Sequence, residues 1–165
     1  AGCLFFNTLL ANSTHTAENS HTGKGDNHVM LSRLMRMLPD LVPLTLYCVF
    51  IFIQSQLPAP FEVPDVSHFD KLLHFGAYGV MAVLFYRTYL AGWPQAMKRT
   101  LIWASVISTV LYGLSDEIHQ YFVPARSADP LDWLADVVGG VLGVVIYQRL
   151  FDATRKIRKF HPPPR

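Results

Sequence analysis

The fold is decided by residues 111–126, Leu111-Tyr-Gly-Leu-Ser-Asp-Glu-Ile-His-Gln-Tyr-Phe-Val-Pro-Ala-Arg126. This stretch continues an apolar run that carries no charge, and then gathers ionisable groups at Asp116, Glu117, His119 and Arg126. A charged side chain at the centre of a bilayer costs about 2.5–3.5 kcal/mol on insertion scales. So many ionisable groups at the end of a lipid-compatible helix therefore need partners or a function.

Helical spacing sorts these groups by face. Asp116, His119 and Gln120 share one face, because residues i, i+3 and i+4 are neighbours on a helix. Glu117 points about 100° away from Asp116, since a helix has 3.6 residues per turn. We take Asp116, Glu117 and His119 as candidate catalytic residues and Gln120 as a candidate ligand contact.

Composition places the chain in a membrane. Of its 165 residues, 51% are hydrophobic and only 16% are charged, which is too apolar for an ordinary small soluble domain. The apolar content lies in four helix-length segments, at about 38–57, 72–90, 100–121 and 131–151. We therefore predict an all-α integral membrane bundle of four transmembrane helices and expect no nucleic-acid partner.

The ends of the chain differ from its centre. Residues 1–29 are polar over most of their length, which predicts a disordered tail. Met30 would suit the start of a membrane protein, so this tail is alternatively a misassigned start. Residues 30–151 form the predicted membrane domain, and residues 152–165 a basic cytoplasmic tail. Prolines at 39 and 43 are expected in the first turns of the first segment, where proline is tolerated.

Charge predicts the orientation. Basic residues flank the first segment on its amino-terminal side, fill the loop between the second and third, and follow the fourth. The other two loops carry mostly acids. By the positive-inside rule both termini face the cytoplasm. At about 1.5 Å per residue, His74 and Asp136 then lie roughly 20 Å, and Asp116 roughly 25 Å, above the cytoplasmic boundary. One shared polar site that opens outward is expected.

The second segment opens with Asp70, Lys71, His74 and Tyr78. Asp70, His74 and Tyr78 share a face at i, i+4 and i+8. A helix cap by Asp70 and an interfacial lysine explain the first two residues. His74 is either functional or holds a buried structural hydrogen bond. We take it as a candidate catalytic residue, and Lys71 and Tyr78 as candidate ligand contacts.

The fourth segment opens with an aspartate before a proline, Asp129-Pro130, which predicts a capped helix start. Asp132 and Asp136 follow at i, i+4, where two carboxylates repel each other unless a cation or a shared proton separates them. We take both as candidate ligand contacts. Glycines at 139 and 143 have the spacing that lets another helix approach closely. Arg126, in the preceding turn, either clamps an anion or is the counter-ion of Asp116 or Asp132.

Three motifs together resemble the VanZ-like family. They are Asp70-Lys-x-x-His74-Phe-x-x-Tyr78, then Asp116-Glu-x-His-Gln-x-Phe-x-Pro-x-Arg126-Ser, then Asp132-x-x-x-Asp136 with the glycines that follow. The resemblance covers about residues 40–150. It implies a small multi-pass protein of the bacterial cytoplasmic membrane. The namesake of the family is associated with low-level resistance to the glycopeptide teicoplanin. It supplies no settled reaction.

Three functions fit this pattern. The first is an enzyme acting on a lipid-linked or phosphorylated envelope molecule, with His119 and Arg126 on the phosphate and Asp116 or Glu117 as the base. The second is a module that binds or transports an amphipathic ligand, such as a glycopeptide or a cell-wall precursor. The third is structural, with the polar groups joining helices. Membrane lipids are the expected partners.

No cofactor is expected from the spacing. The acids and histidines offer nitrogen and oxygen donors that suit zinc or manganese. The sequence Asp-Glu-Ile-His is not the His-Glu-x-x-His signature of a helical zinc site. We therefore assign no metal ligands from the sequence.

Overall fold

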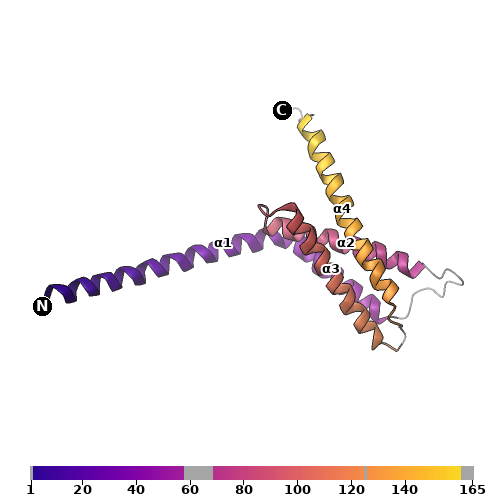
Figure 1. The fold of residues 1–165 in the computed structure, drawn as a ribbon, viewed down its shortest axis with the longest axis horizontal. Helices are drawn as coiled ribbons and strands as arrows, with labels where there is room; N and C mark the ends of the chain where they lie inside the picture. Colours follow the sequence, from indigo (N-terminus) through magenta and orange to yellow (C-terminus); the bar gives the residue numbers. More distant parts are fainter. Residues whose placement is uncertain (1, 58–68, 125, 161–165) are drawn as a thin grey trace. The chain divides into compact units, whose positions relative to one another are not determined.

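The computed structural model describes residues 2–57, 69–124 and 126–160, with side chains described for 27–57, 69–124 and 126–152. Four helices account for nearly all of the described chain (Figure 1): α1 (Gly2–Gln56), α2 (Phe69–Gly92), α3 (Lys98–Tyr121) and α4 (Pro130–Phe160). The predicted all-α class is confirmed. Most of the predicted connector between the first two segments, residues 58–68, lies outside the described residues.

α1 is longer than predicted. It begins at Gly2 rather than near residue 38, and it therefore includes residues for which composition predicts no regular structure. Pro39 and Pro43 lie inside it rather than in its first turns. A proline inside a helix removes a backbone hydrogen bond. The chain divides into two compact units at Arg36–Met37, just ahead of these prolines. The domain boundaries drawn from the sequence stay a prediction.

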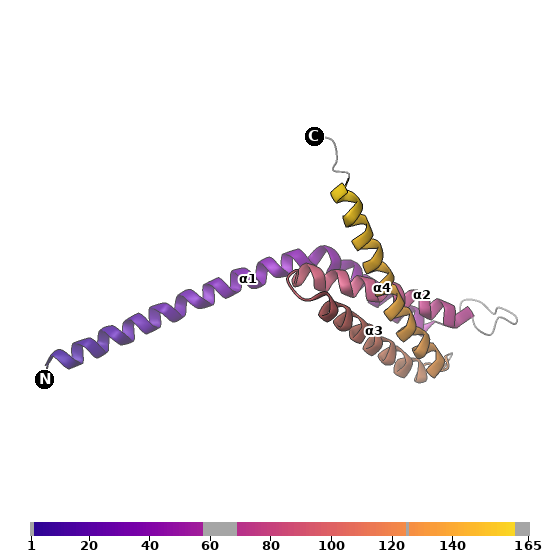
Figure 2. The ribbon, with the colours of Figure 1, turned by 45° about the horizontal axis from the view of Figure 1, so that its top comes forward.

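Within residues 37–165 the helices alternate in direction. Contacts between α2 and α4 rise in step along both helices, from His74–Asp136 to Tyr86–Gln148, so these two helices run parallel. α3 runs against both, because Tyr78 meets Asp116 whereas Tyr89, further along α2, meets Ser108. Figure 2 shows α2 and α3 joined by a short loop, with α4 crossing α2.

Glycines bring α2 and α4 into direct backbone contact. A Cβ atom on Gly139 would collide with the carbonyl oxygen of Phe75, and one on Gly143 would lie 2.5 Å from the carbonyl oxygen of Gly79. The predicted close approach at these glycines is therefore confirmed, and its partner is α2. Further along α2 and α4, beyond these glycines, a small hydrophobic core contains Ala82, Tyr86, Leu101, Val106 and Val144.

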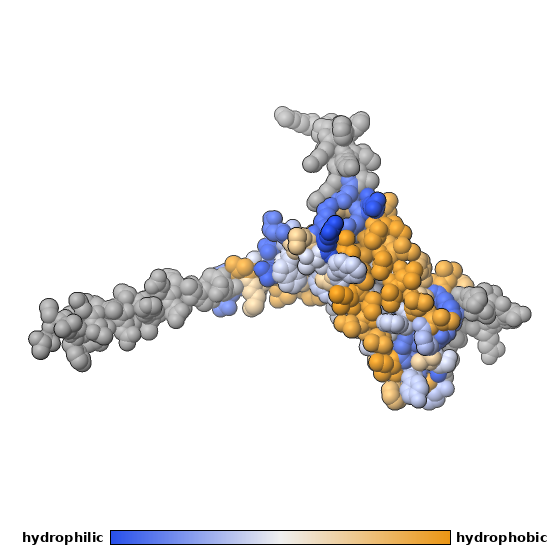
Figure 3. Space-filling view, viewed as in Figure 1, coloured by the Kyte–Doolittle hydropathy of each residue, from blue (hydrophilic) through white to orange (hydrophobic). Residues whose placement is uncertain are grey.

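The outer surface is apolar. Large hydrophobic side chains such as Ile107, Leu111, Leu142 and Ile146 are exposed along α3 and α4, and Figure 3 shows a broad hydrophobic band over these two helices. A soluble protein rarely exposes so large a contiguous patch. The surface is what a helix bundle in lipid requires.

The prediction of four apolar spans is wrong by one. Three helical stretches of the described chain are long and apolar enough to cross a membrane, Asn27–Gln56, Lys98–Tyr121 and Pro130–Asp152. α2 is long enough, with 24 residues or about 36 Å. It is less apolar because it carries His74 and Arg87 together with several tyrosines and glycines. Its buried residues include Tyr78, Tyr86 and Thr88, so part of this polarity faces other helices, whereas Arg87 is exposed.

Candidate functional site

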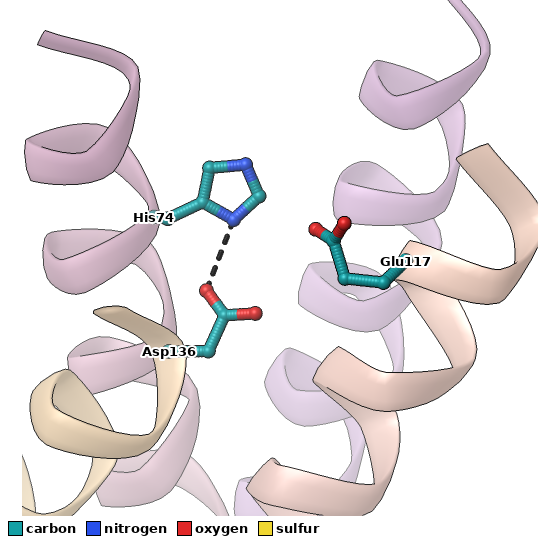
Figure 4. Close-up of side chains that lie close together, drawn as sticks. All are labelled: His74, Glu117 and Asp136. Atoms are coloured by element: carbon teal, nitrogen blue, oxygen red, sulfur yellow. Dashed lines mark hydrogen bonds and ion pairs between the residues drawn. The ribbon is translucent and has the colours of Figure 1, made fainter. Parts of the chain in front are cut away.

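Three ionisable side chains from three helices meet near one end of the bundle (Figure 4). His74 of α2, Glu117 of α3 and Asp136 of α4 each offer a ligand atom, and these atoms lie within 4.8 Å of one another. His74 Nδ1 is 3.0 Å from Asp136 Oδ1. We call these three residues the acid–histidine cluster.

The two acids of the acid–histidine cluster are buried and incompletely bonded. Asp136 is 0% exposed and Glu117 is 7% exposed. Among the described residues, Asp136 Oδ2 and Glu117 Oε1 have no hydrogen-bond partner. An unpaired buried carboxylate oxygen loses its hydration without compensation. These two oxygens therefore mark a place where a proton or a ligand is needed.

Neighbouring groups orient the acid–histidine cluster. The backbone N–H of Asp129 donates to Glu117 Oε2 at 2.9 Å, which fixes one oxygen of that carboxylate. The His74 ring stacks on Tyr78 with centroids 6.0 Å apart and planes 6° apart. Gly113 leaves the room for Asp136, because a Cβ atom there would lie 2.7 Å from Asp136 Oδ2.

Asp116 belongs to a second polar group, next to the acid–histidine cluster. Its Oδ2 accepts the Tyr78 hydroxyl at 3.0 Å and the Gln120 amide at 3.2 Å. All three side chains are buried. The predicted common face of Asp116 and Gln120 is therefore realised. Asp116 joins α3 to α2 through Tyr78, and Gln120 supports it from within α3. Glu117 points elsewhere, to the acid–histidine cluster, as the 100° step requires.

Lys71 separates the acids at the start of α4. Its Nζ lies 2.7 Å from Asp129 Oδ2, 2.9 Å from Asp132 Oδ1 and 3.5 Å from Asp70 Oδ2. Its hydrogen bonds lower the pKa of Asp129, helped by the Leu131 backbone N–H, and Asp129 and Asp132 raise the pKa of Lys71. The i, i+4 carboxylates of Asp132 and Asp136 thus face different partners, Lys71 and His74.

Asp129 caps α4 as the sequence predicts. The helix begins at Pro130, and Asp129 Oδ1 accepts the backbone N–H of Leu131 at 2.9 Å. The same residue also bonds Lys71 and positions Glu117, which spacing alone did not reveal. Its place before a proline signals the cap alone, because Lys71 and Glu117 lie on other helices.

Two predicted site residues lie against α1 instead. His119 Nε2 is 2.7 Å from Gln56 Nε2, and its ring lies 5.0 Å from that of Phe52. Arg126 donates to the carbonyl oxygens of Leu57 and Gln54, each at 2.8 Å. Gln54 lies in the last turn of α1 and Leu57 directly follows the helix, where backbone acceptors lack partners within the helix. In this structure Arg126 caps α1 and pairs with neither Asp116 nor Asp132.

The VanZ/LLP1 family model matches residues 1–152 of the chain. The chain belongs to this family. No curated protein and no solved structure gives a significant match. VanZ-family membership agrees with the resemblance of the three motifs, which lie on α2, α3 and α4 and supply all three residues of the acid–histidine cluster.

Proposed function

We propose that this VanZ-family protein acts on an envelope lipid, or on a lipid-linked or phosphorylated envelope molecule, and uses the acid–histidine cluster for proton transfer. The observation that carries the proposal is the pairing of His74 with a fully buried carboxylate, 3.0 Å away, beside a second buried acid with a free oxygen. A hydrogen-bonded histidine and carboxylate form the usual arrangement for general acid–base catalysis.

An apolar groove on α2 and α4 supports a lipid as the ligand. Its lining residues are Lys71, Leu72, Phe75, Leu131, Leu134, Ala135 and Val138. They lie at the same level of the two helices as His74 and Asp136. Lys71 is the cationic group of this lining and stands at its polar end. A hydrocarbon chain in the groove would place a head group near Lys71. A phosphate there would have to displace part of the ion pairs of Lys71 with Asp70, Asp129 and Asp132.

The binding module remains the second candidate, and the same groove favours it. It needs Lys71 and the apolar lining but no proton transfer. Removing a charge from the acid–histidine cluster distinguishes the two functions, because only the enzyme requires a proton to move there. His119 and Arg126 keep a part in either function only by leaving their contacts with α1.

Filling the groove is the direct test of the lipid proposal. Leu134→Trp should abolish retention of polyprenyl phosphate by the detergent-purified protein, because the indole occupies the space of the hydrocarbon chain. Leu142→Trp is the matched control, because Leu142 lies on the same helix and is similarly exposed, at 42% against 51%. Native mass spectrometry after incubation with polyprenyl phosphate measures the bound lipid. Equal retention by both variants would refute a lipid site in the groove.

We also propose that both termini face the cytoplasm of a bacterial inner membrane. The alternation of helix directions supports one side for both ends, provided that α2 also crosses. The basic residues at those ends support the cytoplasm as that side. Alkaline phosphatase fused after residue 165 should then be inactive, and a fusion at residue 128 should be active. An active carboxy-terminal fusion would contradict the orientation.

A further inference from the structure

We propose that His74, Glu117 and Asp136 bind one divalent transition-metal ion, Zn²⁺ or Mn²⁺. The proposal deepens the proposed function: with an ion bound, the three side chains are its ligands, and the acid–base group is a water in the open position. A lipid can occupy the groove without the ion, so the two proposals fail independently. The three residues come from three helices, and no two of them are close in sequence. Spacing within one helix therefore could not reveal the site.

Geometry is the first argument. Tetrahedral zinc ligands at about 2.0–2.2 Å from the metal lie about 3.3–3.6 Å from one another. His74 Nδ1 and Asp136 Oδ1 are 3.0 Å apart, and all three ligand atoms lie within 4.8 Å. The widest separation this allows exceeds the tetrahedral value by about 1 Å, so binding needs at most a shift of that size in a ligand atom. Figure 4 shows the Glu117 carboxylate turned toward the other two residues.

Charge is the second argument. Asp136 and Glu117 are at least nine-tenths buried, and each has an oxygen without a hydrogen-bond partner among the described residues. The nearby cation, Lys71, makes its ion pairs with Asp70, Asp129 and Asp132. Two buried carboxylates beside a single histidine leave uncompensated negative charge. A divalent ion supplies the missing positive charge.

The surroundings fit a metal centre with an open position. One histidine and two carboxylates are a ligand set used for zinc and manganese. Three protein ligands leave a further position for water or a substrate oxygen, as in catalytic zinc sites. The Asp129 N–H on Glu117 Oε2 orients one ligand from outside, which is the role that supporting hydrogen bonds have around metals.

The test is metal content of the full chain, purified in detergent through a tag without histidine. The protein is loaded with Zn²⁺ or Mn²⁺, desalted and measured by elemental analysis without added lipid. We expect one ion per chain in the wild type and loss of that ion in His74→Gln, Glu117→Gln and Asp136→Asn. Circular dichroism and gel filtration confirm that each variant is folded. The partly exposed His74 provides the variant least able to disturb packing.

Two controls guard against adventitious binding. Asp152→Asn makes the same chemical change on α4 at an exposed pair with Lys98, and it should keep the ion. Replacing His15, His21 and His28 together by asparagine should also keep it. A wild type that holds neither ion after loading would overturn the proposal and assign a proton to the two acids. Equal metal content in the wild type and the three cluster variants would overturn it as well.

Discussion

Asp136→Asn should abolish the activity of the protein while leaving folded protein in the membrane. Asparagine has the shape of aspartate and can still accept a hydrogen bond from His74 Nδ1, which lies 3.0 Å from Asp136 Oδ1. It removes a buried charge rather than adding one, so folding should not suffer. Losing a positioned acid–base group typically lowers a rate by about 10²–10⁴-fold. The low-level teicoplanin resistance associated with the namesake of the VanZ-like family provides the readout.

The measurement is the minimum inhibitory concentration of teicoplanin in a sensitive Gram-positive host that expresses each variant, with membrane levels compared by immunoblot. Asp152→Asn on the same helix should behave as the wild type. Full resistance with Asp136→Asn at normal protein level would exclude a role for this charge. A resistant Asp136→Asn protein beside a sensitive Leu134→Trp protein would favour the binding module over the enzyme.

Much of the site follows from spacing along single helices. The i, i+4 rule placed Tyr78 beside His74 and Gln120 beside Asp116, and both pairs are in contact. Counting residues from the basic loops placed His74 and Asp136 at one depth, and they are hydrogen bonded. These inferences succeed because a helix fixes the angle and rise of each residue, whatever surrounds it.

Spacing along one helix does not predict which neighbouring helix each of its faces contacts. Spacing puts His119 and Asp116 near one face, but it does not say how α3 is rotated against its neighbours. In the structure His119 turns to α1, while Glu117 turns to α2 and α4. The role of Arg126 was missed for a related reason. Its partners are backbone carbonyls at the end of α1, and any residue type can supply a carbonyl.

The second large prediction concerns Gly139, which with Gly143 lets α2 and α4 touch and so sets the distance between these helices. Gly139→Ala should strongly destabilise the bundle. The added methyl group meets the backbone carbonyl of Phe75, and a backbone atom cannot move aside as a side-chain end can. Overpacking of this kind costs about 1–3 kcal/mol and occasionally more. The helices must separate, which would also lengthen the His74–Asp136 hydrogen bond and weaken the acid–histidine cluster.

Gly76→Ala is the matched control for this prediction. A Cβ atom on Gly76 meets nothing within 4 Å, and alanine in a helix is favoured over glycine by roughly 0.5–1 kcal/mol. Thermal unfolding in detergent, followed by circular dichroism, should therefore show a lower midpoint for Gly139→Ala and an unchanged or higher one for Gly76→Ala. Equal midpoints for the two variants would mean that α2 and α4 do not meet at Gly139. The acid–histidine cluster would then lose its basis, since two of its three residues are held together by that contact.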